Sequence, residues 1–296
     1  MKISPARSGS AEFLSMYKDV LANAMTTNKS DPARLFNLRC SQMPYCPRSV
    51  ALNYAIVGMY QCMDMRMAYY VGVGHAVHHV MQTYLASSGS LLADYDCREC
   101  GKKYPFSHKY ECCGFPTRYE EVTIDYKGIV GHIDAIFKDK RGRYWIVDFK
   151  TTSLKSGPKK RTQPGANYKR QVRAYAYLLW KQYGIRVEGC MLVFLPRDNP
   201  WEPIIWETIV KADDMDSIRE ELMADKRLHK KTMEARTLAD FREVFKANCQ
   251  NPYCDNCKAD VNSLLAKIKK NLHKFPIMDD KTKEKIRLQK LAEVAA

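Results

Sequence analysis

The segment 129–150 holds two aspartates and a lysine whose types and spacing could build a hydrolytic metal site. Asp148 and Lys150 lie two residues apart in a run rich in Val, Ile and aromatic residues, so a strand would place both side chains on one face. If the preceding apolar strand pairs with this one through the polar loop 138–143, Asp134, in the middle of that strand, comes close to Asp148. Clustered carboxylates repel one another unless a cation joins them, and such oxygen ligands favour Mg²⁺ or Mn²⁺.

This arrangement would suit hydrolysis of a phosphodiester. The metal would polarise the scissile phosphate and lower the pKa of a bound water, while Lys150 would orient that water or stabilise the developing negative charge. The alternative is that Asp134 and Asp148 face solvent at strand ends and that Lys150 is a surface partner. Asp148 follows the apolar run Trp-Ile-Val, however, and Asp is disfavoured inside strands, which favours the metal site. Glu121, on an earlier strand, could approach the same site but matches no motif.

An expected helix over 67–86 carries further polar side chains. Its residues His75, His78, His79 and Gln82 fall near one helix face by their spacing. Any of the three histidines could equally be a buried, hydrogen-bonded core residue.

A short cysteine-rich insert has too few aliphatic residues to form a core of its own. Cys97 and Cys100 form a knuckle-like pair, and eleven residues separate Cys100 from the adjacent Cys112 and Cys113. Four thiolates in such an insert predict a structural Zn²⁺ site, which would supply folding energy. Because adjacent cysteines are unusual ligands, His108 could replace one of them; the alternative is four free thiols on an unstructured loop.

A second cysteine group lies near the C-terminus. Cys249, Cys254 and Cys257 are three ligands, one short of a closed site, so a fourth must come from elsewhere in the chain. The alternative is that the three cysteines are incidental. Cys62 and Cys190 are expected to be plain buried residues.

The composition narrows the class of protein. The 296 residues contain 48 Lys and Arg against 33 Asp and Glu, and a hydrophobic content of 46% argues against a disordered or fibrous chain. A net charge of +15 suits a polyanionic partner, most simply nucleic acid. No apolar run approaches the roughly 18 residues that cross a bilayer, so we expect a soluble, intracellular protein. The basic residues nearest the acidic site, which could contact DNA phosphates, are Lys155, Lys159, Lys160, Arg161, Lys169 and Arg170.

The pattern of the chain predicts a single mixed α/β domain. Helices are expected through about residue 95 and again over 168–184 and 212–247. In the helix expected near 67–86, Gly72 and Gly74 would lie before or in the first turn. Period-two runs predict strands, which are 119–125, 129–137, 144–149, 189–195 and 203–210.

Four ordered motifs within residues 46–257 resemble the PD-(D/E)XK nuclease superfamily, in particular its RecB-like exonuclease branch, which includes CRISPR-associated RecB-like exonucleases and the AddB nuclease domain. The first is Gly74, His78 and Gln82, spaced by four, where the branch usually has Glu at the third position. The others are Gly131 to Asp134, Asp148-Phe149-Lys150, and Gln171 to Tyr175.

The resemblance implies a role for each matching residue. It implies a core with a central mixed sheet flanked by helices, in which His78, Asp134, Asp148 and the Phe149 carbonyl bind Mg²⁺ or Mn²⁺. Lys150 would be catalytic. On a second helix, Gln171 and Tyr175, one turn apart, would position the DNA or the catalytic strand. Gln82 would support a ligand and would not bind the metal itself.

The resemblance also suggests a fourth partner for the C-terminal cysteines. Cys46-Pro-Arg48 is similar to the Cys-Pro-Arg at which nucleases of this branch supply the first ligand of a [4Fe–4S] cluster. The spacing of the other three cysteines departs from the usual pattern, so Zn²⁺ remains an alternative there, and Cys40 could replace Cys46. The organisation expected is a helical segment 1–45, a nuclease domain 46–257 with a zinc-ribbon-like insert 96–116, and a basic helical tail 258–296.

These observations predict a metal-dependent DNA exonuclease that acts on DNA ends or single strands in recombination, repair or viral DNA processing. A non-catalytic DNA-binding metalloprotein, and an endonuclease or junction resolvase of the same superfamily, are the alternatives. The sequence has no P-loop, so any helicase, annealing protein or recombinase would be a separate partner. The expected location is the cytoplasm of a bacterium or of a virus-infected host cell.

Overall fold

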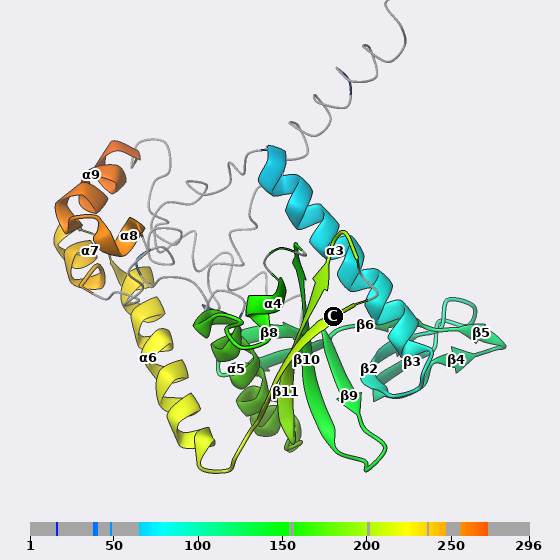
Figure 1. Cartoon of the computed structure of the whole chain (residues 1–296). Coiled ribbons are helices and arrows are strands. Elements are labelled where there is room, and N and C mark those ends of the chain that lie inside the picture. Colours follow the sequence, from blue (N-terminus) through cyan, green and yellow to red (C-terminus); the bar gives the residue numbers. More distant parts are fainter. Residues whose placement is uncertain are drawn as a thin grey trace, which may run out of the picture.

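The structure is a computed structural model of the chain (Figure 1). Cys46, Cys249 and Cys254, most of the helix expected near Met16, and the tail beyond Asn271 lie outside the residues it describes. The described residues are 16, 38–40, 48, 65–153, 155, 157–199, 202–235, 237–246 and 255–271.

A mixed sheet forms the centre of the fold, as expected. Its long strand β10 runs parallel to β11 on one side and antiparallel to β9 on the other. The order of strands is β12 (Ile204–Ile209), β11 (Gly189–Pro196), β10 (Tyr144–Thr152), β9 (Ala135–Lys138), β2 (Leu91–Asp96) and β3 (Lys103–Ser107), with β6 (Arg118–Glu120) also paired to β2.

A smaller sheet lies beside the central one. β8 (Ile129–Ile133) pairs antiparallel with β7 (Val122–Tyr126) and parallel with β1 (Leu38–Arg39). A separate two-stranded ribbon, β4 (Glu111–Cys112) with β5 (Phe115–Pro116), belongs to the cysteine-rich insert.

Helices cover both faces of the central sheet, and in Figure 1 the cyan α3 and the yellow α6 lie on opposite sides of the strands. Side chains of α3 pack with one face of the sheet, and those of α5 and α6 pack with the other. The predicted end of α5 at Gly184 is confirmed, since that glycine has the left-handed conformation (φ 72°) and its N–H bonds the Trp180 carbonyl. The helices are α3 (Met65–Ala86), α4 (Gly157–Lys160), α5 (Ala166–Tyr183), α6 (Asp214–Glu234), α7 (Leu238–Val244), α8 (Asp255–Lys258) and α9 (Val261–Asn271).

The alternation of side chains along β10 decides where its polar residues point. Val147 and Phe149 pack in the cluster on the α3 face, whereas Ile146 packs in the cluster on the α5 face. By the period of two, Asp148 and Lys150 share the α5 face with Ile146.

Two strands expected to be continuous are broken, which corrects the sequence analysis. The run 129–137 divides into β8 and β9, which belong to different sheets, so Asp134 lies between two strands and not in the middle of one. The run 119–125 likewise divides at Glu121 into β6 and β7. Since Val122 pairs with Ile133, the two breaks lie next to each other, where the chain passes from one sheet to the other.

Two other expectations were wrong. Residues 91–95 were expected to be helical but form β2, after a turn at Gly89 that has a positive φ of 66°. Gly72 and Gly74 lie in the interior of α3, because that helix begins at Met65.

Among the described residues, no helix is long and apolar enough to cross a membrane.

Candidate active site

The site begins where β9 and β10 separate. The two strands pair from Tyr144–Lys138 to Val147–Ala135, and the pairing stops there. The Phe149 N–H, which has no partner on β9, donates to the Asp134 carboxylate over 2.8 Å. A buried amide needs an acceptor. Because the β9–β10 pairing has ended before Phe149, its N–H bonds the Asp134 side chain and fixes that side chain against β10.

Four contacts hold Asp134 at the strand break. Its Oδ2 accepts the Phe149 N–H and lies 3.3 Å from His78 Nδ1 of α3. Its backbone carbonyl accepts hydrogen bonds from Tyr119 Oη (2.7 Å) and from Gln82 Nε2 (2.9 Å). Both the side chain and the backbone of this residue are therefore fixed from outside its own strands.

Asp148 is a buried carboxylate with an incomplete set of partners. The residue is 1% exposed, and among the described residues its Oδ1 has no hydrogen-bond partner. Its one close charge partner among them is Lys150, whose Nζ lies 2.5 Å from Oδ2. A buried ionised carboxylate is costly unless its lone pairs are used, which is the condition that a metal ion relieves.

The electrostatics of the group agree with a cation site. Burial raises the pKa of Asp134, and the neighbouring charge of Asp148 adds to the effect. Burial also raises the pKa of Asp148, against the attraction of Lys150. For Lys150, burial alone would lower the pKa, but the attraction of the two carboxylates outweighs it and the pKa is raised. A divalent cation beside Asp134 and Asp148 would favour the ionised form of both carboxylates and so lower their raised pKa values.

His78 has the protonation state that metal binding requires. Burial lowers its pKa to about 4, with help from the positive charge of Lys150, so the ring is neutral at pH 7. Its ring also lies edge-on to Phe149 at 6.0 Å. Asp134, Asp148 and His78 offer the kinds of oxygen and nitrogen donor that Mg²⁺ or Mn²⁺ accepts, although their ligand atoms do not all lie within 4.8 Å of one another.

Sequence reasoning gave Glu121 little weight and overlooked Tyr119. Gln82 Nε2, which donates to the Asp134 carbonyl, also donates to Glu121 Oε1 over 2.7 Å. Glu121 lies at the strand break that faces Asp134, and its charge helps to raise the pKa of Asp134. No local pattern marks such a break, because it depends on the pairing of β7 with β8.

The two polar residues of α5 are buried behind the site. Gln171 is 6% exposed and donates through Nε2 to Tyr175 Oη over 3.0 Å. Tyr175, 3% exposed, packs so closely on Gly131 that a Cβ there would lie 2.7 Å from its ring. This burial favours support of the catalytic strand over direct contact with DNA.

A family model described as "PD-(D/E)XK nuclease superfamily" matches residues 102–261, which include Asp134, Asp148, Lys150 and Tyr175. This chain belongs to the PD-(D/E)XK nuclease superfamily. Members of the superfamily use divalent metals, in keeping with the donor set at the strand break.

Solved structures similar to this PD-(D/E)XK nuclease have low sequence identity. One described as SSO0001 is 16% identical, covers 81% of this chain and 93% of its own, and has a TM-score of 0.40. The alkaline exonuclease LHK-Exo from Laribacter hongkongensis is 12% identical, covers 67% of this chain and 90% of its own, and has a TM-score of 0.37. The same enzyme in complex with dAMP gives 11% identity, the same coverage and a TM-score of 0.36. No curated protein matches the chain.

The basic residues of this nuclease divide into two groups. Lys155, Lys159 and Arg161 are exposed and follow β10 in the chain. Lys160 and Lys169 lie over aromatic rings, at 5.7 Å from Phe194 and 5.1 Å from Trp206. In both contacts the charged ammonium group lies over the ring, which is a cation–π arrangement.

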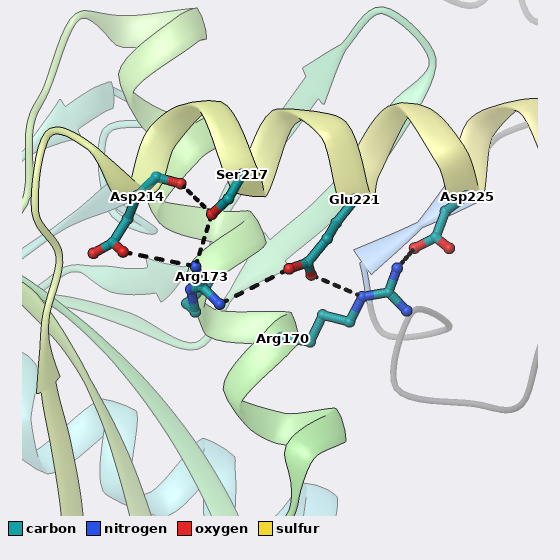
Figure 2. Close-up of polar contacts among 6 residues, drawn as sticks. All are labelled: Arg170, Arg173, Asp214, Ser217, Glu221 and Asp225. Carbon is teal, nitrogen blue, oxygen red and sulfur yellow. Dashed lines mark hydrogen bonds and ion pairs between the residues drawn. The ribbon is translucent and has the colours of Figure 1, made fainter. Parts of the chain in front are cut away.

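Arg170 was predicted to contact DNA, and its side chain contacts two carboxylates of α6. Its Nε lies 3.2 Å from Glu221 and its Nη2 lies 2.5 Å from Asp225, both on α6 (Figure 2). Figure 2 also shows Arg173 next to Ser217, to which it donates over 3.2 Å. Arg170 therefore joins α5 to α6 through ion pairs with Glu221 and Asp225.

The cysteine-rich insert brings four thiols together. Among the described residues, the only set of three or more Cys, His, Asp or Glu donors that all lie within 4.8 Å of one another is Cys97, Cys100, Cys112 and Cys113. The predicted knuckle is formed, since Gly101 N–H bonds the Cys97 carbonyl. The hydrogen bond with Tyr104 lowers the pKa of Cys112 to about 7. This cluster can bind a metal, and His108 is not part of it.

Of the C-terminal cysteine group only Cys257 is described. Arg48 donates to its backbone carbonyl over 3.3 Å and to the Ala259 carbonyl over 3.1 Å. Cys40 and Cys190 are fully buried in the main core.

Proposed function

We propose that this protein is a Mg²⁺- or Mn²⁺-dependent deoxyribonuclease, an exonuclease that hydrolyses phosphodiester bonds at DNA ends or in single strands. The observation that carries the proposal is the buried Asp148 carboxylate, whose one close partner among the described residues is Lys150. A bound cation would stabilise the ionised form of this buried carboxylate, and a metal-dependent phosphodiester nuclease needs a cation for catalysis. Recombination, repair or viral DNA processing is the expected context.

Each residue of the site would have a distinct part. Asp134, Asp148, His78 and the Phe149 carbonyl would hold the metal, which would supply a polarised phosphate and a water of lowered pKa. Lys150 opposes the rise in the pKa of Asp148 and holds a positive charge on the same strand face, where it would stabilise negative charge on the phosphate.

The surface beside the catalytic strand supports a DNA substrate. Lys155, Lys159 and Arg161 are exposed there, and Lys160 and Lys169 extend the same basic surface. Such a surface neutralises phosphates on either side of a scissile bond. One of the similar solved structures is an alkaline exonuclease bound to dAMP, which agrees with a DNA substrate.

The test compares Lys150→Ala with wild type on end-labelled linear and closed circular DNA, single-stranded and duplex, with Mg²⁺ or Mn²⁺. The matched control is Lys140→Ala, an exposed lysine in the loop at the opposite end of the β9–β10 hairpin. We expect the control to cleave as wild type does and Lys150→Ala to lose cleavage. Equal cleavage by all three would refute the catalytic role, and cleavage of closed circles would indicate an endonuclease. DNA binding by wild type without cleavage would indicate a non-catalytic binding protein.

We also propose two further metal sites. Zn²⁺ is expected on Cys97, Cys100, Cys112 and Cys113, since four soft thiolates are the usual ligands of structural zinc. A [4Fe–4S] cluster, or Zn²⁺ at the same site, is proposed for the three C-terminal cysteines together with Cys46. The contact of Arg48 with Cys257 supports this, because Arg48 is two residues from the proposed first ligand. Anaerobic purification, visible absorption and metal analysis distinguish the cases, and a colourless protein with zinc alone would refute the iron–sulfur cluster. The proposed ligands are Cys46, Cys249, Cys254 and Cys257.

A further inference from the structure

Three tyrosines lie side by side across neighbouring strands of the central sheet. Tyr95 of β2 is the direct cross-strand partner of Tyr104 on β3 and of Tyr119 on β6. Directly paired residues project from the same face of a sheet, so the three side chains form one row. The Tyr95 and Tyr119 rings meet edge to face, with centroids 5.8 Å apart, and Tyr95 is fully buried.

The two ends of the row contact the two candidate metal sites. At one end Tyr104 Oη lies 3.0 Å from Cys112 Sγ, within the cysteine cluster. At the other end Tyr119 Oη donates to the Asp134 carbonyl over 2.7 Å. The cysteine cluster and the strand break at Asp134 are therefore joined by one continuous set of packed side chains.

Asp134 needs such support because of its place in the chain. It lies between β8 and β9, so no strand ladder fixes its backbone. Its carbonyl has two donors among the described residues, Tyr119 and Gln82, and the Gln82 amide group also serves Glu121. Among these donors, removal of the Tyr119 hydroxyl would leave the Asp134 carbonyl with Gln82 only, which it shares with Glu121.

We propose that Tyr119 is a positioning residue for Asp134, and that the metal-bearing cysteine insert holds Tyr119 in place through Tyr104 and Tyr95. The proposal rests on the role of Asp134 as a metal ligand in the proposed nuclease. Its physical basis is that groups which orient a ligand control metal affinity although they never touch the ion. The insert thus has a function at the cation site as well as in its own folding.

The test is Tyr119→Phe, which keeps the ring contact with Tyr95 and removes only the hydroxyl. The matched control is Tyr183→Phe, which removes a hydroxyl that donates to the Thr123 carbonyl over 3.0 Å from the exposed last residue of α5. The first measurement is Mn²⁺ binding to zinc-loaded protein, followed by the electron paramagnetic resonance signal of free Mn²⁺. We expect Tyr119→Phe to weaken Mn²⁺ binding about 10-fold and Tyr183→Phe to leave it unchanged. Equal affinity in wild type and Tyr119→Phe, or an equal loss in the control, would overturn the proposal.

A second measurement separates positioning from a merely structural role. Since Tyr119 supports a metal ligand, we expect Tyr119→Phe to lower kcat at fixed Mg²⁺, to recover part of it at high Mg²⁺, and to leave KM for DNA unchanged. A rise in KM alone would contradict the proposal. If wild type cleaves no DNA while Tyr119→Phe still weakens Mn²⁺ binding, the nuclease function fails and the positioning role stands.

A third measurement tests the link to the insert. Cys100→Ser should release the zinc and weaken Mn²⁺ binding by a similar factor, because the insert acts through Tyr119. The double variant Cys100→Ser/Tyr119→Phe should then bind Mn²⁺ no more weakly than either single variant. Losses that multiply in the double variant, or Mn²⁺ binding unchanged in Cys100→Ser after zinc loss, would show that the insert does not act through Tyr119.

Discussion

Gly131→Ala tests how closely α5 packs behind the active site. A Cβ at Gly131 would lie 2.7 Å from Tyr175 Cε1 and 3.0 Å from Cys40 Sγ. Both neighbours are buried in the main core, so neither can move away freely. Added volume in a packed core costs about 1 to 3 kcal/mol of the free energy of unfolding. At about 2 to 4 °C per kcal/mol, the melting temperature should fall by about 2 to 12 °C.

The control for this prediction is Gly72→Ala in the interior of α3. A Cβ there meets no atom within 4 Å, and Ala is favoured over Gly in helices by about 1 kcal/mol. The two substitutions add the same methyl group, and we expect opposite signs. The assay is thermal or urea unfolding followed by circular dichroism, with Mg²⁺-dependent cleavage measured beside it.

The result that would refute the reasoning is equal stability of Gly131→Ala and wild type. It would mean that Tyr175 does not lie against β8 as described, and the argument that α5 supports the catalytic strand would fail with it. A loss of stability with full cleavage would instead limit the role of this packing to stability. We expect both to fall, because β8 leads directly into Asp134.

Three further predictions concern charged groups. Arg170→Met should lower the free energy of unfolding by about 1 to 3 kcal/mol, because it removes the ion pair with the largely buried Asp225. DNA affinity measured by fluorescence anisotropy should stay unchanged, and a large loss of affinity would support the predicted contact of Arg170 with DNA. Lys159→Ala should weaken DNA binding and reduce the slope of log affinity against log salt by about 0.7 to 0.9, and an unchanged slope would exclude a phosphate contact. Burial opposes ionisation of Asp139, but hydrogen bonds from Arg143, Trp145 and Arg141 lower its pKa to about 2, so its stabilising effect is complete above pH 4 and is lost as the pH falls towards 2. The difference in melting temperature between wild type and Asp139→Asn should therefore shrink over that range, and a constant difference would contradict the shifted pKa.

The local part of the site could be predicted from the sequence. The hairpin that joins the two strands through 138–143 is confirmed by the pairing of Val147 with Ala135. Alternation along that hairpin also gave the shared face of Asp148 and Lys150, because a period of two is a property of any strand.

The non-local part could not be predicted. The break at Asp134 exists because β8 pairs with β1 and β7 while β9 pairs with β10 and β2, and no residue near the break encodes those partners. The ion pairs of Arg170 could not be predicted for a related reason, since Glu221 and Asp225 lie more than 50 residues further along the chain. In both cases the deciding contact comes from a distant segment.

The contact between Arg48 and the carbonyls of Cys257 and Ala259 has a consequence for biosynthesis. The partners are separated by 209 and 211 positions, so Arg48 leaves the ribosome long before either acceptor exists. The closing of so long a loop is a late event in folding. Nascent chains that stop before residue 257 should therefore lack this contact, although β1 and Cys40 can already pack against β8 in them.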